Sequence, residues 1–454
     1  MMAQTMRGRV GNSLALMVLA LTCWQEAFSF SQHYCRQRAS LLCITGKAKD
    51  QDETAIDRQR TLNTSNTIMH RRDMLRAGVA LSVLTTLPKP SVAIDKTSIA
   101  ATWSATDGLN SLDEGKEFVS FDVTAYRAMR DDPTRTPLFE KAILNRLGNN
   151  PEAKVVVDLG TGPFALFAIM AAEAGARKVY AIEASPAAAN SARQCAQRAG
   201  FGDVITVLQG FSTDISLPEK ADLCIAEIVG SIATEEGAYA TIRDAHKRFV
   251  KEPNLDSSWI PSRIQTYMAP ASYTLHNLFG PPEFDWSKLQ GEPVRFNCRD
   301  KGLALLADPV LVEDVVFSEI LSPQQDARMK KKEFNFVVDA DRVNDNTLSM
   351  YDEFRRGKSS VKASEILAQA TAHSFSGVAM WPRLLLDDTT TVNAREYGTG
   401  GYQRSHWQTV LPIMSSRPVS PFLGGEQIFI ATDFQISAND VTKSPVYSIT
   451  GTIG

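Results

Sequence analysis

Two glycines and two acids give the first chemical signal in this sequence. Gly160 and Gly162 flank a threonine, and Ala165 stands at the third small position of the pattern G-x-G-x-x-G/A, which lets a ligand approach the backbone closely. Glu183 follows 23 residues after Gly160, where an acid can accept both hydroxyls of a ribose. Asp158, just before the glycines, would repel a pyrophosphate and would suit a cationic ligand such as the methionine part of S-adenosylmethionine. These residues favour this methyl donor as the cofactor.

A nicotinamide cofactor is the alternative, because the same glycine pattern surrounds a pyrophosphate in many dehydrogenases. The common short-chain version of that chemistry needs Tyr-x-x-x-Lys, and none of the ten tyrosines is followed by lysine at this spacing. The glycine pattern alone is a weak signal, so the elements around it decide how it is interpreted.

Strands and helices are predicted to alternate around the glycine turn. Each predicted strand is a short run of β-branched and apolar residues, and the segments between them have helical compositions. This order predicts an α/β fold with a Rossmann-like, doubly wound parallel sheet, in which ligands bind at the carboxyl ends of the strands. Asp158, Glu183 and Glu227 all fall at such ends. The four predicted strands are 154–159, 178–182, 204–208 and 221–226.

Composition and charge limit the class of protein. The 454 residues are 44% hydrophobic and 22% charged, which is typical of a soluble globular protein. Residues 1–95 carry 12 Lys and Arg against 7 Asp and Glu, whereas the whole chain carries 48 against 51, which leaves 36 against 44 for the remainder. Such an acidic body is a poor partner for nucleic acid and tolerates a cationic substrate. The six cysteines form no Cys-x-x-Cys pair, so we expect no metal site.

The N-terminal region is predicted to begin with a targeting sequence. Arg7 precedes the apolar run Leu14–Trp24, which has the length of a signal-peptide core and is too short to span a bilayer comfortably. The following Ala27-Phe28 resembles the junction in plastid presequences of algae with secondary plastids, and residues 31–60 are rich in Ser, Gln and Arg, as transit segments are. The alternative for the apolar run is a buried helix.

A second targeting signal follows the first. Residues 71–76 read Arg-Arg-Asp-Met-Leu-Arg, as in a twin-arginine signal, and 77–87 form a mildly apolar core. Ser91 and Ala93 supply small residues for cleavage. We therefore assign residues 1–93 to targeting and expect the protein in the plastid of a secondary-plastid alga, with the thylakoid lumen as the twin-arginine destination. The mature chain is expected to keep no stable membrane span.

Five separated segments resemble the protein arginine N-methyltransferase family and occur in the family's order. The resemblance runs from about Phe118 to the C-terminus. It implies an S-adenosylmethionine-dependent methyltransferase domain followed by a β-barrel, with the active site between them. The segments are YRAMRDDPTR (126–135), VVDLGTG (156–162), AGARKVYAIEA (174–184), AEIVGSIATEE (226–236) and SHWQT (405–409).

The resemblance implies that Glu227 and Glu236 hold the guanidinium of a substrate arginine, because the family carries two glutamates nine residues apart after the fourth strand. Arginine stays protonated at neutral pH, since its pKa exceeds about 12. Two carboxylates in a closed pocket would orient the guanidinium, localise its charge and leave the target nitrogen more nucleophilic, while alignment supplies much of the rate. The alternative is that both are solvated loop acids, as the neighbouring Glu235 suggests.

The resemblance also implies a substrate slot and a proton acceptor. His406 would pair with Asp132, to accept the released proton or to lock the covering helix over the site, and the alternative is a structural histidine. Trp407 would form a wall of the arginine slot, with barrel core as the alternative. Tyr126, on the covering helix, would also contact the substrate.

Cofactor contacts are implied on both sides of the glycine turn. Met129 would lie beside the transferred methyl group, and Arg135 would bind the carboxylate of the cofactor unless it makes only a surface ion pair. Many family members have an acid after the third strand, where this chain has Ser212, so a hydroxyl or the backbone would contact the adenine. The predicted cofactor set is Met129, Arg135, Asp158, Gly160, Gly162, Glu183 and Ser212.

Short β-rich runs recur after Pro261 and predict a sandwich or barrel, which fits the β-barrel of the family. We therefore expect a methyltransferase domain with its covering helix at 94–260 and a β-barrel substrate domain at 261–454, with an insertion near 341–370. Residues 272–305 occupy the place of the family's helical dimerisation arm without a clear helical pattern, so a homodimer is expected from the resemblance alone. The predicted strands are 264–269, 309–317, 334–338, 374–381, 408–413 and 427–431.

The leading functional hypothesis is methylation of exposed arginines in protein substrates. A methyltransferase for a small molecule or another residue, and a non-catalytic binding module with the same fold, are the alternatives. The kind of methylated product stays open. By resemblance to the family, Met129 disfavours symmetric dimethylation, whereas Asp132-Pro133 and Gly230-Ser231 resemble the branch that forms the symmetric product.

Overall fold

The computed structural model describes nine ranges of the chain, which all belong to one unit, Ala93–Gly454. The predicted signal, transit and twin-arginine segments at 1–93 lie outside the described residues. In the part that is described, no helix is both long and apolar enough to cross a membrane. The ranges are 97–104, 109–111, 117–119, 121–148, 154–282, 284–289, 291–357, 359–395 and 405–454.

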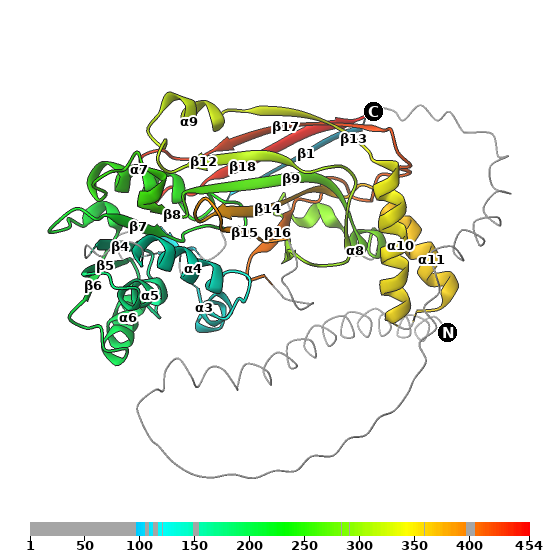
Figure 1. Ribbon diagram of the computed structural model, residues 1–454. Helices are drawn as coiled ribbons and strands as arrows, with labels where there is room; N and C mark the ends of the chain where they lie inside the picture. The colour runs from blue at the N-terminus through cyan, green and yellow to red at the C-terminus, as the bar shows by residue number, and fades with distance from the viewer. Residues whose placement is uncertain are drawn as a thin grey trace, which may run out of the picture. The chain divides into compact units, whose positions relative to one another are not determined.

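A parallel sheet surrounds the glycine turn. Its strands follow the order β6-β5-β4-β7-β8, and every neighbouring pair is parallel (Figure 1). The order changes direction between β4 and β7, which is where ligands bind in sheets of this kind. The predicted Rossmann-like sheet is confirmed. The strands are β4 (Val155–Leu159), β5 (Lys178–Glu183), β6 (Ile205–Gln209), β7 (Leu223–Ala226) and β8 (Trp259–Ile260).

The helices that connect these strands begin at residues suited to helix starts. α6 (Pro186–Arg198) has proline in its first turn, and the side chain of Ser185 accepts a hydrogen bond from the Ala188 amide at 3.3 Å. α7 (Ala238–Arg248) follows Gly237, whose φ of 76° belongs to the left-handed region that glycine adopts readily. The other helices here are α3 (Val123–Arg130), α4 (Thr136–Leu147) and α5 (Leu166–Glu173).

Two larger antiparallel sheets make up most of the C-terminal part. The larger one has the order β10-β16-β14-β9-β11, with β12 also paired to β9 and β15 to β14, and the smaller one has the order β1-β18-β17-β13 (Figure 1). The predicted β-barrel-like fold is confirmed. The strands are β9 (Arg263–Tyr273), β10 (Val294–Asn297), β11 (Leu303–Leu305), β12 (Val310–Val316), β13 (Lys332–Val337), β14 (Gly377–Leu385), β15 (Thr391–Asn393), β16 (Gln408–Leu411), β17 (Gln427–Gln435) and β18 (Val446–Ile453).

One cluster of buried apolar residues joins the parallel sheet to the larger antiparallel sheet. It contains Val157 of β4, Trp259 of β8 and Trp381 of β14. Because burial of apolar surface is the main stabilising term, this shared core fixes the two sheets against each other. Side chains from both sheets can therefore be held at one site.

The N-terminal strand joins the C-terminal sheet. β1 (Thr97–Ser104) pairs antiparallel with β18, from Thr97 opposite Ile453 to Ser104 opposite Val446. We expected this segment with the methyltransferase domain at 94–260, so the pairing differs from that assignment. A short hairpin, β2 (Leu109–Ser111) with β3 (Glu117–Val119), precedes α3.

The insertion predicted near 341–370 is a pair of helices, α10 (Ala340–Arg356) and α11 (Val361–Ala372), which pack on each other (Figure 1). Asp339 and Ser360 cap their N-termini through side-chain hydrogen bonds to backbone amides. The described residues of the segment 272–305, in contrast, form two short helical elements besides strands. They are α8 (Thr274–Leu278) and η4 (Trp286–Leu289).

Candidate active site

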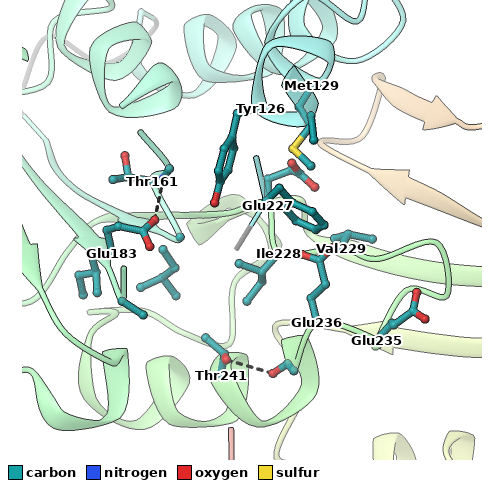
Figure 2. A pocket seen from close by; sticks show the side chains of 18 of the residues that line it. Tyr126, Met129, Thr161, Glu183, Glu227, Ile228, Val229, Glu235, Glu236 and Thr241 are labelled. Carbon is teal, nitrogen blue, oxygen red and sulfur yellow. Dashed lines mark hydrogen bonds between the residues drawn. The ribbon is translucent and has the colours of Figure 1, made fainter. Parts of the chain in front are cut away.

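A cavity of about 490 Å³ lies at the carboxyl ends of β4, β5 and β7. Its walls come from α3, the glycine turn, the loop after β7, the segment before β16 and the loop between β17 and β18. Figure 2 shows Tyr126 and Met129 of α3 on one side of this cavity, opposite Glu236. The predicted site residues that line it are Tyr126, Met129, Arg135, Gly160, Gly162, Glu183, Ser212, Glu227, Glu236, His406 and Trp407.

The glycine turn leaves its backbone open toward the cavity. Gly160 and Gly162 have φ values of 70° and 65°, which favour glycine over other residues. Glu183 accepts hydrogen bonds from the Gly162 amide at 2.9 Å and the Ser185 amide at 2.8 Å. Burial raises the pKa of Glu183, and these amide donors partly offset the effect.

Asp158 lies behind the turn and does not line the cavity, which differs from the predicted cofactor contact. Its side chain is buried and accepts a hydrogen bond from the Thr161 hydroxyl at 2.6 Å. Burial raises the pKa of Asp158 to about 7, and the charges of Glu183 and Glu227 act in the same direction. The structure therefore gives Asp158 a place in the support of the turn.

Arg135 and Glu227 form a buried ion pair at the cavity wall. The guanidinium nitrogen Nη2 donates to Glu227 Oε2, and the two side chains are only 6% and 7% exposed. Nη1 donates to the Met129 carbonyl at 3.1 Å, and the guanidinium lies 4.8 Å from the centre of the Phe167 ring. The surface ion pair that was the alternative for Arg135 is thus excluded, because this pair is buried.

The two consecutive glutamates of the loop after β7 point in different directions. Figure 2 shows Glu236 directed toward the region between Tyr126, Met129 and Glu227, whereas Glu235 is directed away from it. Glu235 is buried and forms an ion pair with Arg295 of β10. Glu235 is therefore not the solvated loop acid that the sequence suggested.

His406 and Asp132, which were predicted to pair, do so. Nδ1 of His406 lies 3.0 Å from Asp132 Oδ2, and the His406 backbone amide donates to the same oxygen at 2.9 Å. Burial opposes ionisation of Asp132, but hydrogen bonds from His406 and Thr134 outweigh it and bring the pKa to about 2. Burial lowers the pKa of His406, and the hydrogen bond to Asp132 only partly offsets this. A neutral His406 donates its Nδ1 proton to Asp132 and keeps Nε2 as an acceptor.

Trp407 belongs to the core and to the cavity wall at once. It is 3% exposed, and its Nε1 donates to the Val229 carbonyl at 2.7 Å. Both predicted roles, slot wall and barrel core, are compatible with this position. Within the described ranges, no group of three or more His, Cys, Asp or Glu side chains could hold a metal ion.

Part of the sequence is similar to known arginine methyltransferases. Protein arginine N-methyltransferase PRMT10 of Oryza sativa subsp. japonica is 35% identical over 144 residues, which is 32% of this chain and 36% of that protein. The PRMT10 protein of Arabidopsis thaliana is 33% identical over 156 residues, 34% of this chain and 39% of that protein. This chain is a relative of the protein arginine N-methyltransferases. The match spans little more than a third of the length of either relative.

Solved structures of arginine methyltransferases share the fold. The crystal structure of Arabidopsis thaliana protein arginine methyltransferase 10 matches with a TM-score of 0.52 at 17% identity, over 73% of this chain and 93% of that one. The Trypanosoma brucei PRMT1 enzyme-prozyme heterotetrameric complex with AdoHcy matches with a TM-score of 0.51 at 18% identity, over 71% and 91%. A family model described as ribosomal protein L11 methyltransferase (PrmA) matches residues 141–241. The fold is that of a methyltransferase.

Two parts of the site in this relative of the arginine methyltransferases were not predicted from its sequence. Arg295 holds Glu235, and the loop residues Val441–Pro445 between β17 and β18 line the cavity. An ideal Cβ on Gly237 would lie 3.2 Å from the Val441 carbonyl oxygen, so this loop approaches the residue after Glu236 closely. Neither feature has a local sequence pattern, because both depend on contacts between distant strands.

Proposed function

We propose that this protein transfers the methyl group of S-adenosylmethionine to guanidinium nitrogens of arginine in proteins. One observation carries the proposal: Glu227 and Glu236 line the same cavity as the glycine turn and Glu183, in a relative of the arginine methyltransferases. Such a cavity can hold an arginine side chain and a nucleoside cofactor next to each other.

The residues around the glycine turn fit the proposed cofactor. A carboxylate has about four acceptor sites, so Glu183 can accept ribose hydroxyls in addition to its two amide donors. Gly160 and Gly162 would present bare backbone to the methionine part, and Ser212, for which an adenine contact is expected, also lines the cavity. When bound, S-adenosylmethionine supplies an activated methyl group on a sulfonium.

The two glutamates would orient the substrate guanidinium. Glu227 already accepts the guanidinium of Arg135, which supports its capacity to bind this group. Because a carboxylate has further acceptor sites, Glu227 can keep Arg135 and accept a second guanidinium. Glu236 would bind the same guanidinium from the opposite side, which fixes the target nitrogen and excludes water.

His406 is the proposed acceptor of the proton that methylation releases. A guanidinium nitrogen exchanges a hydrogen for a methyl group, so one proton leaves for each methyl group added. His406 is kept neutral by burial, is anchored by Asp132 and feels the charge of Glu227. These conditions suit a general base with one free ring nitrogen.

The clamp is tested most sharply by Glu236→Gln. Replacing Glu227 would strip the buried Arg135 of its partner, at a cost of about 3–5 kcal/mol, and would confuse folding with function. We expect Glu236→Gln to lower kcat by about 10²–10³-fold, because it removes one preorganised charge, and to leave the affinity for S-adenosylhomocysteine unchanged. Transfer of labelled methyl groups to single-arginine peptides measures kcat, and calorimetry measures binding.

The exposed Glu140 of α4 supplies the matched control, since Glu140→Gln makes the same change away from the cavity. A Glu236→Gln variant as active as this control would refute the clamp. Mass spectrometry of the product identifies the methylated residue and distinguishes mono- from dimethylation.

Methylation of a different residue in proteins is the second candidate. It is favoured by the match of residues 141–241 to the L11 methyltransferase family model, a range that includes Glu227 and Glu236. In that case the labelled methyl group would be found in protein but on a residue other than arginine. Label found only on small molecules would instead support a small-molecule methyltransferase.

We also propose that two copies of the chain associate. The support is that the Trypanosoma brucei neighbour is described as a heterotetrameric complex. Analytical ultracentrifugation over a range of concentrations should reveal a species with twice the mass of one chain. A single species with the mass of one chain at all concentrations would contradict this.

A further inference from the structure

The loop that carries both glutamates, residues 227–237, is fastened to the antiparallel sheets along its length. The Ala233 amide donates to Thr266 Oγ1 of β9 at 2.9 Å. The Gln408 amide of β16 donates to Ser231 Oγ at 3.1 Å. The loop leaves the parallel sheet at β7, yet it is held by backbone and side-chain groups of the C-terminal strands.

Arg295 of β10 makes a two-point contact with this loop. Its Nη1 donates to Glu235 Oε2 at 3.2 Å, and its Nη2 donates to the other carboxylate oxygen. The two side chains are 17% and 4% exposed, so the pair is shielded from water. The amide of Ile232 also donates to Glu235 Oε2, at 3.3 Å. Since Glu235 directly precedes Glu236, the pair fixes the backbone from which Glu236 projects.

Glu313 of β12 makes the second anchor. Its carboxylate accepts the hydroxyl of Thr234 on the loop and the hydroxyl of Thr266 on β9. The Tyr447 hydroxyl lies 3.3 Å from Thr234 Oγ1. Glu313 is 1% exposed, and a buried carboxyl opposes folding unless its oxygens are hydrogen-bonded. These hydroxyls therefore tie Thr234, two residues before Glu236, to the sheet.

We propose that Arg295 and Glu313 are positioning residues that hold Glu236 in the cavity, Arg295 through Glu235 and Glu313 through Thr234. Neither Arg295 nor Glu313 is among the residues that line the cavity, so neither contacts substrate or cofactor there. The inference rests on the proposed function, because that function gives Glu236 its role. If the inference holds, the antiparallel sheets align Glu236, the acid that faces the substrate.

A purely structural role is the competing explanation, and the same sheet offers a control for it. Arg263 of β9 makes a two-point ion pair with Asp314 of β12, at 2.6 and 2.5 Å. Asp314 is the residue after Glu313, so its side chain faces the other side of the strand. Arg263→Met therefore breaks a comparable ion pair that does not reach the loop.

The experiment compares Arg295→Met, Arg295→Lys, Glu313→Gln and the control Arg263→Met, each in the chain of residues 94–454. Hydrogen exchange detected by mass spectrometry reports on the amides of 228–237, and steady-state kinetics with a single-arginine peptide gives kcat and KM. We expect Arg295→Met and Glu313→Gln to speed loop exchange and to lower kcat by about 10²-fold, since a shift of about 1 Å can have this effect. The affinity for S-adenosylhomocysteine should not change.

Arg295→Lys should recover part of the lost kcat, because it keeps the charge but not the two-point geometry. Glu313→Gln keeps the shape of the side chain. If Arg295→Met does not fold, loop exchange and kcat of Glu313→Gln test the proposal instead. The proposal is overturned if Arg295→Met and Glu313→Gln lose only thermal stability, as Arg263→Met should, or if loop exchange rises while kcat stays at the unmodified value. Absence of arginine methylation by the unmodified protein would refute the proposed function, and loop exchange would still decide whether these residues hold the loop.

Discussion

Burial and hydrogen bonding shift the pKa values of the acids near the cavity in different directions. Burial raises the pKa of Asp158 to about 7 and also raises that of Glu183. Asp132 is buried as well, yet its pKa is about 2 because its hydrogen bonds to His406 and Thr134 outweigh the loss of water. The balance between burial and hydrogen-bond donors therefore sets the pKa of each carboxyl.

Replacing Asp158 by asparagine tests this account through stability. Between pH of about 4 and about 7, the folded state binds a proton at Asp158 that the unfolded state has released. The free energy of unfolding therefore falls as pH rises through this window, by at most about 4 kcal/mol at about 1.4 kcal/mol per pKa unit. We expect Asp158→Asn to lose less stability than the unmodified protein over the same window, as measured by urea unfolding at a series of pH values.

Asp203 provides the control for this measurement because its side chain is exposed. Asp203→Asn should leave the pH dependence as it is in the unmodified protein. If Asp158→Asn also leaves it unchanged, the carboxyl behind the glycine turn is not the group that titrates.

The sequence identified the residues of the cavity better than it identified their partners. Glu227 was placed at the end of a predicted strand, and the pair Glu227 and Glu236 was recognised from the resemblance to the arginine methyltransferase family, which carries two glutamates nine residues apart. Their ionic surroundings were not found, since Arg135 is 92 residues from Glu227 and Arg295 is 60 residues from Glu235. No local pattern encodes such contacts, because they arise only when distant strands are assembled.

Among the elements beside the cavity, the turn between β4 and α5 contains two glycines with positive φ, Gly160 and Gly162. An ideal Cβ on Gly160, whose φ is 70°, would lie 2.8 Å from Ile228 Cγ2. Gly160→Ala should therefore destabilise the fold by at least about 1 kcal/mol through backbone strain and should also weaken S-adenosylhomocysteine binding through the displaced turn. Thermal unfolding and calorimetry measure the two effects.

Gly175 is the control that separates the effect of backbone strain from the effect of displacing the glycine turn. Its φ is 93°, and an added Cβ would meet nothing within 4 Å. Gly175→Ala should lower stability by a similar amount and leave binding intact. Equal weakening of binding by both variants would mean that the position of Gly160 beside the cavity is irrelevant.

Four of the five strands of the parallel sheet were predicted, because each is a short run rich in apolar and β-branched residues, whereas β8, Trp259–Ile260, was missed because it has only two residues. β18, Val446–Ile453, was missed because Ser, Thr and Gly interrupt its apolar residues. β1 was not predicted as a strand either, and its pairing has no local pattern because its partner strand β18 lies more than 300 residues further along the chain. The insertion near 341–370 was recognised as extra sequence, but its two helices depend on packing against each other.

At the scale of the whole molecule, the proposed destination is the plastid. We expect residues 1–93 fused to a fluorescent protein to enter the plastid of an alga with secondary plastids, and the mature enzyme to begin at Ile94. Fluorescence microscopy and N-terminal sequencing check these outcomes. Changing Arg71 and Arg72 to lysine should block only the transfer into the lumen, because the twin-arginine pair is read after plastid import.

A fusion that stays outside the plastid would contradict the first targeting signal. A mature N-terminus upstream of the twin-arginine pair would contradict the second. Either result leaves the methyl-transfer proposal intact, because every residue that lines the cavity lies at position 121 or later in the chain.

The pairing of β1 with β18 sets the order of synthesis, sheet formation and proteolytic processing. Thr102 and Ser448, whose hydroxyls meet at 3.0 Å, are 346 residues apart, so the ribosome must add all the intervening residues before β1 can pair with β18. The smaller sheet can close only after β18 has been synthesised. A processing protease that cut within Thr97–Ser104 would break the pairing of β1 with β18, whereas a cut after Ala93 would leave every residue pair between these strands in place.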